Sequence, residues 1–248
     1  MTFSVPSATP VPPDTSGPRR ERAVSGTPRS GKVVRRDVWW DEAMARRASW
    51  WQYRDSIGDR SELFDAIART WPIQRALYPG SYVDLSPSTA IPTVTYVDTD
   101  VRAAKYFADT QRVQAELSRT SHPVADAEVI FLASDYTGTL PIADHSTDLV
   151  ISLFAGPVWD HCRRYLRPGG WLLANTSHGD ASLAALDPSL RLVGVAHHRE
   201  GRHRLSTDHL DEYLMPKRAE TADPEQIRRT GRGIAYTRSA FAYVFENT

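Results

Sequence analysis

Short apolar runs alternate with helix-like segments along most of the chain, and this alternation restricts the fold more than any other feature. Runs rich in β-branched and aromatic residues predict strands at 75–79, 93–98, 128–135, 147–156, 170–177, 191–198 and 239–246. Helices are expected between them, at 100–118, 157–166 and 181–186. Nearly continuous apolar strands separated by helices predict an α/β fold with an open, mostly parallel sheet covered on both faces.

The two ends of the chain differ from this central pattern. Residues 1–35 are rich in proline, serine and arginine, which predicts a disordered tail. Residues 36–72 carry tryptophans among good helix formers and predict a helical N-terminal cap. The remaining residues, 73–248, form the expected α/β domain, with a polar insertion at about 199–237 that should hold helices near 207–214 and 224–229.

Charge and composition exclude several classes of function. The chain has 30 basic and 30 acidic residues, so it has no net field to attract nucleic acid or an anionic membrane. No apolar run approaches the roughly 18 residues that a membrane span needs. The single cysteine excludes an internal disulfide and suits a reducing compartment. We therefore expect a cytoplasmic protein without a membrane partner.

Two segments in the later half follow a characteristic order: "FLASDYTGTLPIADHSTDLVISLFAG" and then "YLRPGGWLLAN". An acid ends the third strand, a short segment with a proline leads into the fourth, and a helix followed by Leu-Arg-Pro-Gly-Gly precedes an apolar fifth strand. In this order and spacing, residues 73–198 resemble the class I S-adenosylmethionine-dependent methyltransferase superfamily. The resemblance implies a Rossmann-like, seven-stranded, mostly parallel sheet, with the last strand of the chain at its usual edge.

The resemblance also implies a set of cofactor contacts. The acid that ends the second strand holds the ribose hydroxyls in this family, which points to Asp98 in preference to Asp100. The acid that ends the third strand, Asp135, corresponds to the residue that holds the adenine amine. By the same correspondence, further cofactor contacts are Ser134, Tyr136 and, after the fourth strand, Leu153.

The loop after the first strand departs from the family's glycine motif, and two registers fit it. In the first, Gly80 is the first glycine, Tyr78 replaces the usual acid, and Gly80, Ser81 and Tyr82 form an altered wall. In the second, Asp84 is the acid and serines replace the glycines. The first is favoured, because Asp84 lies too close to the second strand for the usual helix, with prolines between them. In either register that helix shrinks to a turn near 86–91, with Ser86 as its cap.

The histidines are weaker candidates for a functional site. His197, His198, His203 and His209 lie close together in sequence, but an arginine-rich, solvated connection is favoured over a metal site. His178, after the fifth strand, is a candidate general base, with an ordinary loop histidine as the favoured alternative. No catalytic residue is assigned.

The function expected is methyl transfer from S-adenosylmethionine, and a small-molecule acceptor is favoured over protein or RNA. A non-catalytic relative that has lost the cofactor loop is the main alternative, and an enzyme using a different nucleotide is a second. The segment from Gly80 to Pro92 is the feature that separates them.

Overall fold

The computed structural model describes residues 49–120, 124 and 127–248. The tail predicted at 1–35 and residues 36–48 of the predicted cap lie outside the described residues. The rest of the cap forms α2 (Trp50–Ile57), capped by the Ser49 side chain, and α3 (Ser61–Thr70).

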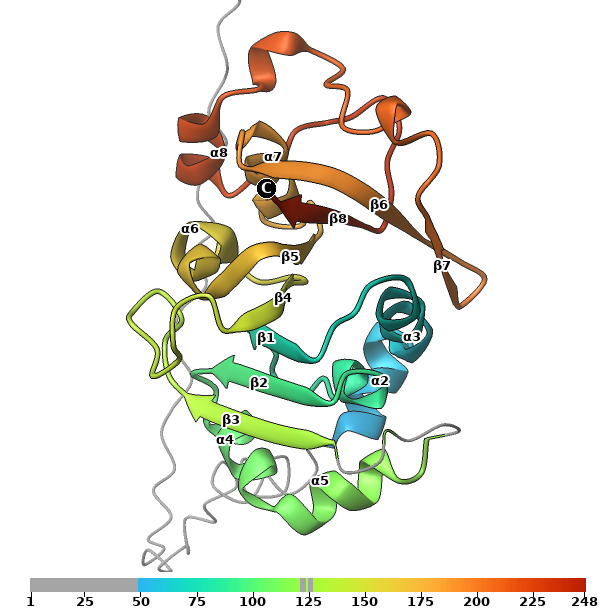
Figure 1. Cartoon of the computed structure of the whole chain (residues 1–248), viewed down its shortest axis with the longest axis vertical. Helices are drawn as coiled ribbons and strands as arrows, with labels where there is room; N and C mark the ends of the chain where they lie inside the picture. Colours follow the sequence, from blue (N-terminus) through green and yellow to red (C-terminus); the bar gives the residue numbers. More distant parts are fainter. Residues whose placement is uncertain (1–48, 121–123, 125–126) are drawn as a thin grey trace, which may run out of the picture. The chain divides into compact units, whose positions relative to one another are not determined.

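One sheet organises the described residues (Figure 1). Its order is β3-β2-β1-β4-β5-β8-β6-β7. The first five strands pair in parallel, whereas β8 runs antiparallel to both of its neighbours and β7 forms an antiparallel hairpin with β6. The strands are β1 (Arg75–Pro79), β2 (Thr93–Asp98), β3 (Glu128–Ala133), β4 (Thr147–Ser152), β5 (Leu166–Ala174), β6 (Leu190–Arg199), β7 (Arg202–Ser206) and β8 (Ala242–Asn247).

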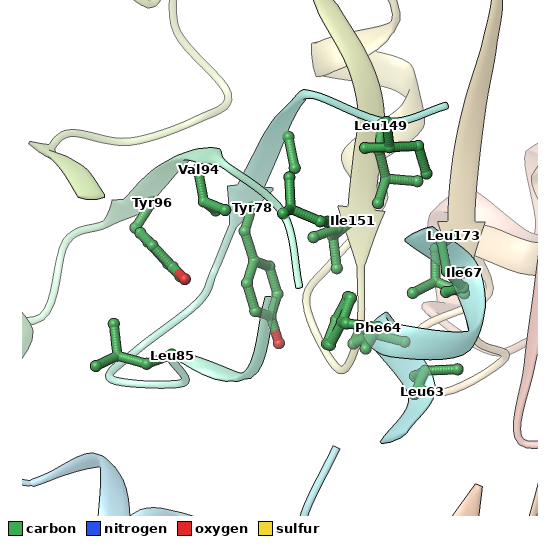
Figure 2. Packing of buried hydrophobic residues seen from close by; sticks show 14 of the residues in the cluster. Leu63, Phe64, Ile67, Tyr78, Leu85, Val94, Tyr96, Leu149, Ile151 and Leu173 are labelled. Atoms are coloured by element: carbon green, nitrogen blue, oxygen red, sulfur yellow. The ribbon is translucent and has the colours of Figure 1, made fainter. Parts of the chain in front are cut away.

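Helices cover both faces of this sheet, as the apolar strands require. On one face lie α2, α3, α4 (Val101–Ala108) and α5 (Thr110–Leu117), and on the other lie α6 (Val158–Cys162) and α7 (Asp180–Leu186). Alternate strand residues separate the two cores: Tyr78 packs on the first face, whereas Leu77 packs on the second. Figure 2 shows the first core, where α3 side chains meet β1, β2, β4 and β5.

The fold predicted from the sequence is confirmed, with differences in detail. The sheet has eight strands because residues 202–206, expected to be loop, pair with β6. The last strand, β8, lies between β5 and β6 and not at an edge. The helix predicted at 100–118 is interrupted, because the Asp109 carboxylate accepts the Arg112 N–H and caps a new helix.

Two further expectations about local structure are wrong. The Arg-Pro-Gly-Gly segment does not form the C-terminus of a helix. It belongs to β5, where Gly169 has φ +67° and the pairing with β4 shifts its register. Residues 207–214 contain only the short 3₁₀ turn η3 (Leu210–Glu212). A second such turn, η4 (Ala219–Thr221), precedes α8 (Pro224–Thr230), which agrees with the helix predicted near 224–229 and is capped by the Asp223 side chain.

Candidate functional site

The strand order reverses between β1 and β4, and the carboxyl ends of both strands lie at that point. β1 pairs with β2 on one side and with β4 on the other, all in parallel, so the loops after these three strands converge. In open α/β sheets a ligand binds in the crevice at such a switch point. The segments that form this region are the turn at 80–82, the end of β2, and the loop 153–157.

Asp98, the last residue of β2, is half-buried and holds the turn in place. One carboxylate oxygen accepts the Tyr82 N–H at 2.7 Å and the other accepts the Asp100 N–H at 2.8 Å. A carboxylate has about four acceptor positions, so it retains capacity for two hydroxyl donors. Asp100 instead caps α4, accepting the Arg102 N–H at 2.7 Å and pairing with the Arg102 guanidinium at 2.6 Å. Of the two acids, Asp98 is therefore the one placed to meet a ligand.

The turn after β1 keeps a backbone that glycine adopts most easily, although only its first residue is a glycine. Gly80 has φ +65° and Tyr82 has φ +46°, both in the left-handed region. The Gly80 N–H donates to the Val97 carbonyl at 2.8 Å. A Cβ at Gly80 would lie 2.8 Å from the Ala155 Cβ, so the turn packs directly on the loop after β4. Ser81, between the two, is 1% exposed.

Short 3₁₀ turn η1 (Ser86–Thr89) replaces the helix that usually follows β1, as the sequence predicts. Ser86 lies inside this turn and is not its cap. Its N–H and hydroxyl both donate to the Asp84 carboxylate, at 3.1 and 2.5 Å. The first of the two registers places the end of the strand at Gly80. The bounds of β1 and the positive φ of Gly80 agree with it.

Tyr78 belongs to a buried polar network. Its hydroxyl donates to the Asp84 carboxylate at 3.2 Å, and the Arg60 guanidinium donates to the same carboxylate oxygen at 3.0 Å. Arg60 is 4% exposed and Asp84 is fully buried. Burial, with Asp84 beside it, raises the pKa of Tyr78 well above its ordinary value. The Tyr78 side chain, seen in Figure 2 pointing into the core, therefore supports the turn from inside the core. It is not free to contact a ligand.

Sequence reasoning did not find Arg60 as a member of this network. An isolated arginine before α3 carries no pattern that separates it from a surface arginine. Asp84 gave a better signal, because it lies between two apolar residues, Val83 and Leu85, which are also buried.

The residues after β3 lie nearer the surface. Asp135 is exposed, and one of its oxygens accepts the N–H and the hydroxyl of Thr137 at 2.9 and 2.8 Å, which lowers its pKa. The Ser134 N–H donates to the Leu132 carbonyl at 2.9 Å. The half-buried Tyr136 hydroxyl accepts the Gly156 N–H at 3.2 Å. Tyr136 thus links the end of β3 to the loop after β4.

The loop after β4 presents Phe154 and not Leu153. Leu153 is 2% exposed and packs in the first core, whereas Phe154 is 50% exposed and has φ +61°. The Asn175 side-chain oxygen accepts the N–H groups of Phe154 and Ser177, both at 3.3 Å, and so ties the ends of β4 and β5 together.

The histidines do not gather into a metal site. His197 pairs with the Tyr213 hydroxyl at 2.9 Å, whereas His198 stacks on His203 with ring centroids 4.4 Å apart. Within the described ranges, no group of three or more histidine, cysteine or acidic side chains is arranged to hold a metal ion. His178 is exposed in the turn after β5.

The cavities of about 190 to 670 Å³ found in the described part of the chain lie away from the switch point. One of about 670 Å³ lies between α3 and β7, and one of about 430 Å³ lies beside Trp51 and α3. The contact of Gly80 with Ala155 closes the space between the two loops.

The chain is similar to a curated bacterial protein. Over 154 residues, 62% of this chain, the protein is 30% identical to a 23S rRNA (guanine(748)-N(1))-methyltransferase from Streptomyces fradiae. The chain spans about half the length of this relative. No protein-family model matches the sequence. In the sheet of this chain, β1 to β5 follow the methyltransferase order, and the antiparallel strand β8 comes after β5.

The order and directions of the chain's strands are those of the methyltransferase-type, Rossmann-like α/β fold. Solved structures of methyltransferases also align with it. One from Aquifex aeolicus aligns with a TM-score of 0.42 and 15% identity, over 59% of this chain and 89% of that chain. The N-methyltransferase NodS from Bradyrhizobium japonicum aligns with a TM-score of 0.38 and 14% identity, over 76% and 82%. Among the described residues of this methyltransferase-fold chain, no helix has the length and apolar character to cross a membrane.

Proposed function

We propose that the protein transfers a methyl group from S-adenosylmethionine to a small-molecule acceptor. The observation that carries the proposal is the position of Asp98 at the switch point, with spare acceptor capacity, beside a turn that keeps two left-handed residues. A strand-end carboxylate suits a ribose, because each hydroxyl donates one hydrogen bond to it.

The residues at this edge of the sheet fit the cofactor in part. Asp98 would hold the ribose, and Asp135 and Tyr136, with Ser134 behind them, would bound the adenine end. The turn at Gly80, Ser81 and Tyr82 would face the amino-acid end with backbone groups, because the Ser81 side chain is buried. Tyr78 and Leu153 would act from the core, since neither is accessible.

The bound cofactor would supply an electrophilic methyl group on a sulfonium. The protein's task is then to align an acceptor with that methyl group and to exclude water, and proximity provides most of the rate enhancement. Such a reaction needs no fixed nucleophile on the protein, which agrees with the absence of a catalytic motif in the sequence.

The small-molecule acceptor is inferred from the net charge of the described part of the chain. The Streptomyces relative is named for a guanine in 23S rRNA. Residues 49–248 of this chain hold 25 of its 30 acidic residues but only 21 of its 30 basic ones. A net negative domain repels a phosphate backbone, whose neutralisation by cations dominates nucleic-acid affinity. A small molecule is therefore the better acceptor for the described part of the chain.

A second candidate function is non-catalytic, and one observation favours it. The turn at Gly80 packs on Ala155, and Asp98 is already bonded to the Tyr82 N–H. A fold kept for binding or assembly would show the same closed contact, since it need not open for a cofactor.

Thermal shift of the purified full-length chain with S-adenosylmethionine, S-adenosylhomocysteine, NAD and ATP separates these candidates. A ligand at 100 times its Kd stabilises the folded state by about 2.7 kcal/mol, which raises Tm by several degrees. Stabilisation by the first two ligands alone supports methyl transfer. Stabilisation by none supports the non-catalytic candidate, and stabilisation by NAD or ATP alone indicates a different nucleotide.

A further inference from the structure

Phe154 is the one aromatic residue among the large apolar side chains exposed in the described ranges, the others being Val101, Ile130 and Met215. It is the second residue after β4, and its neighbour Ala155 is the residue on which Gly80 packs. The exposed ring therefore lies beside the turn to which the proposed function assigns the cofactor.

The Phe154 backbone is held in an unfavourable conformation. Its φ of +61° is rare for an aromatic residue and lowers the folding equilibrium constant on the order of tenfold or more, although the residue stays 50% exposed. Asn175, only 5% exposed, holds this conformation by accepting the Phe154 N–H at 3.3 Å. The buried Asn175 side chain thus maintains a strained backbone that leaves the Phe154 ring partly exposed. Such strain indicates that the ring binds a partner.

The surroundings of the ring leave one face for that partner. The Arg60 guanidinium carbon lies 4.9 Å from the ring centroid and, because Arg60 is 4% exposed, covers the inner face. Arg60 is itself fixed by Asp84 at 3.0 Å. Phe241, which precedes β8, lies at 6.1 Å with its ring tilted by 56° and forms a side wall. The outer face of Phe154 is the exposed one.

An unpartnered polar group lies behind the side wall. The His203 ring is 4.9 Å from the Phe241 ring, and neither of its nitrogens has a hydrogen-bond partner although the residue is only 7% exposed. The row from Phe154 through Phe241 to His203 is thus aromatic, with successive rings tilted by 56° and 69°, and it has a hydrogen-bonding group at its buried end. Burial, with His198 and Arg60 nearby, lowers the pKa of His203 to about 4, so this ring is neutral near pH 7.

We propose that the outer face of Phe154 is the stacking surface for the methyl acceptor, and that the acceptor is a small molecule with a planar aromatic or heteroaromatic ring. This inference rests on the proposed methyl transfer. A hydroxyl oxygen on the ring, or a ring nitrogen that carries a proton, would form a bond to the methyl carbon as the carbon–sulfur bond breaks. S-adenosylhomocysteine then leaves with the electron pair of that bond on sulfur, and the acceptor's proton passes to solvent.

A fragment panel tests the inference. Phenols and heteroaromatic lactams are paired with saturated analogues such as cyclohexanol and 2-piperidone, and binding to the full-length chain with S-adenosylhomocysteine is followed by saturation-transfer NMR. Aromatic fragments should bind and saturated ones should not. Phe154→Ala should weaken binding about tenfold, the size of one ring-stacking contact. Phe154→Tyr should retain it, and the exposed-residue control Met215→Ala should leave it unchanged.

S-adenosylhomocysteine affinity, measured by calorimetry for every variant, keeps the two proposals distinguishable. If S-adenosylhomocysteine does not bind the wild type, the proposed function fails. If it binds, but saturated fragments bind as well as aromatic ones or Phe154→Ala binds like the wild type, the acceptor inference is overturned. Methyl transfer from S-adenosylmethionine to transcribed 23S rRNA, with none to free rings, would overturn the small-molecule acceptor.

Discussion

The backbone N–H of Tyr82 donates a 2.7 Å hydrogen bond to the Asp98 carboxylate, and so joins the turn after β1 to the end of β2. The tyrosine ring points elsewhere: it meets Tyr53 edge-on at 5.0 Å and lies under the Arg102 guanidinium at 5.3 Å. The backbone of Tyr82 therefore does the work that a glycine does in a regular motif, and its side chain fastens the turn to α2 and α4.

Tyr82→Gly tests this division of roles. Glycine keeps the N–H and adopts φ +46° without strain, so affinity for S-adenosylhomocysteine should change by less than about threefold. Stability should fall by about 1 kcal/mol, because the ring contacts are lost. Calorimetry and urea unfolding measure the two effects. A loss of affinity of tenfold or more would show that the ring itself contacts the cofactor.

Gly80→Ala should destabilise the fold more than Gly201→Ala. Both glycines have positive φ, +65° and +74°, so both substitutions carry the same backbone strain of about 1 kcal/mol. Only at Gly80 does the new Cβ meet another atom, at 2.8 Å from the Ala155 Cβ, whereas nothing lies within 4 Å at Gly201. The difference between the two free energies of unfolding isolates the contact between the turn and the loop after β4. Equal losses would show that the two loops separate easily.

The fold could be predicted from the sequence because its strands are apolar on both faces, a pattern that few other architectures produce. β7 was missed for the opposite reason: "RHRLS" is polar, and only its pairing with β6 makes it a strand. The position of Asp98 at the end of the second strand could be predicted from the sequence, and its expected role came from the resemblance to the methyltransferase family. The role of Tyr78 did not, because its place in the core depends on Arg60, which comes from a different element.

Asp84→Ala should cost about 3–5 kcal/mol, because it leaves the Arg60 guanidinium buried without its partner. The matched control is Asp65→Ala, which breaks the pair with Arg69, whose side chain is 73% exposed. That change should cost at most about 1 kcal/mol. Urea unfolding gives both values. Similar losses for the two variants would show that the buried network does not hold the turn.

Asp180 makes stability depend on pH. It is 1% exposed beside the Trp159 N–H, and burial raises its pKa to about 7 from an ordinary 3.8. Between about pH 4 and pH 7 the folded state keeps a proton that the unfolded state has released, so this carboxyl lowers stability as the pH rises. Asp180→Asn should therefore gain stability relative to the wild type as the pH rises from about 4 to about 7. A constant difference in free energy of unfolding across that range would contradict the assignment.

The most direct test of the account is calorimetric titration of S-adenosylhomocysteine into the wild type, Asp98→Asn and Asp100→Asn. Asp98 is placed for the ribose, whereas Asp100 is engaged as the cap of α4 with Arg102. A hydrogen bond to a charged group contributes about 1.5–3 kcal/mol. The account predicts binding to the wild type, at least about tenfold weaker binding to Asp98→Asn, and nearly unchanged binding to Asp100→Asn. No binding to the wild type, or equal affinity for Asp98→Asn, would contradict it.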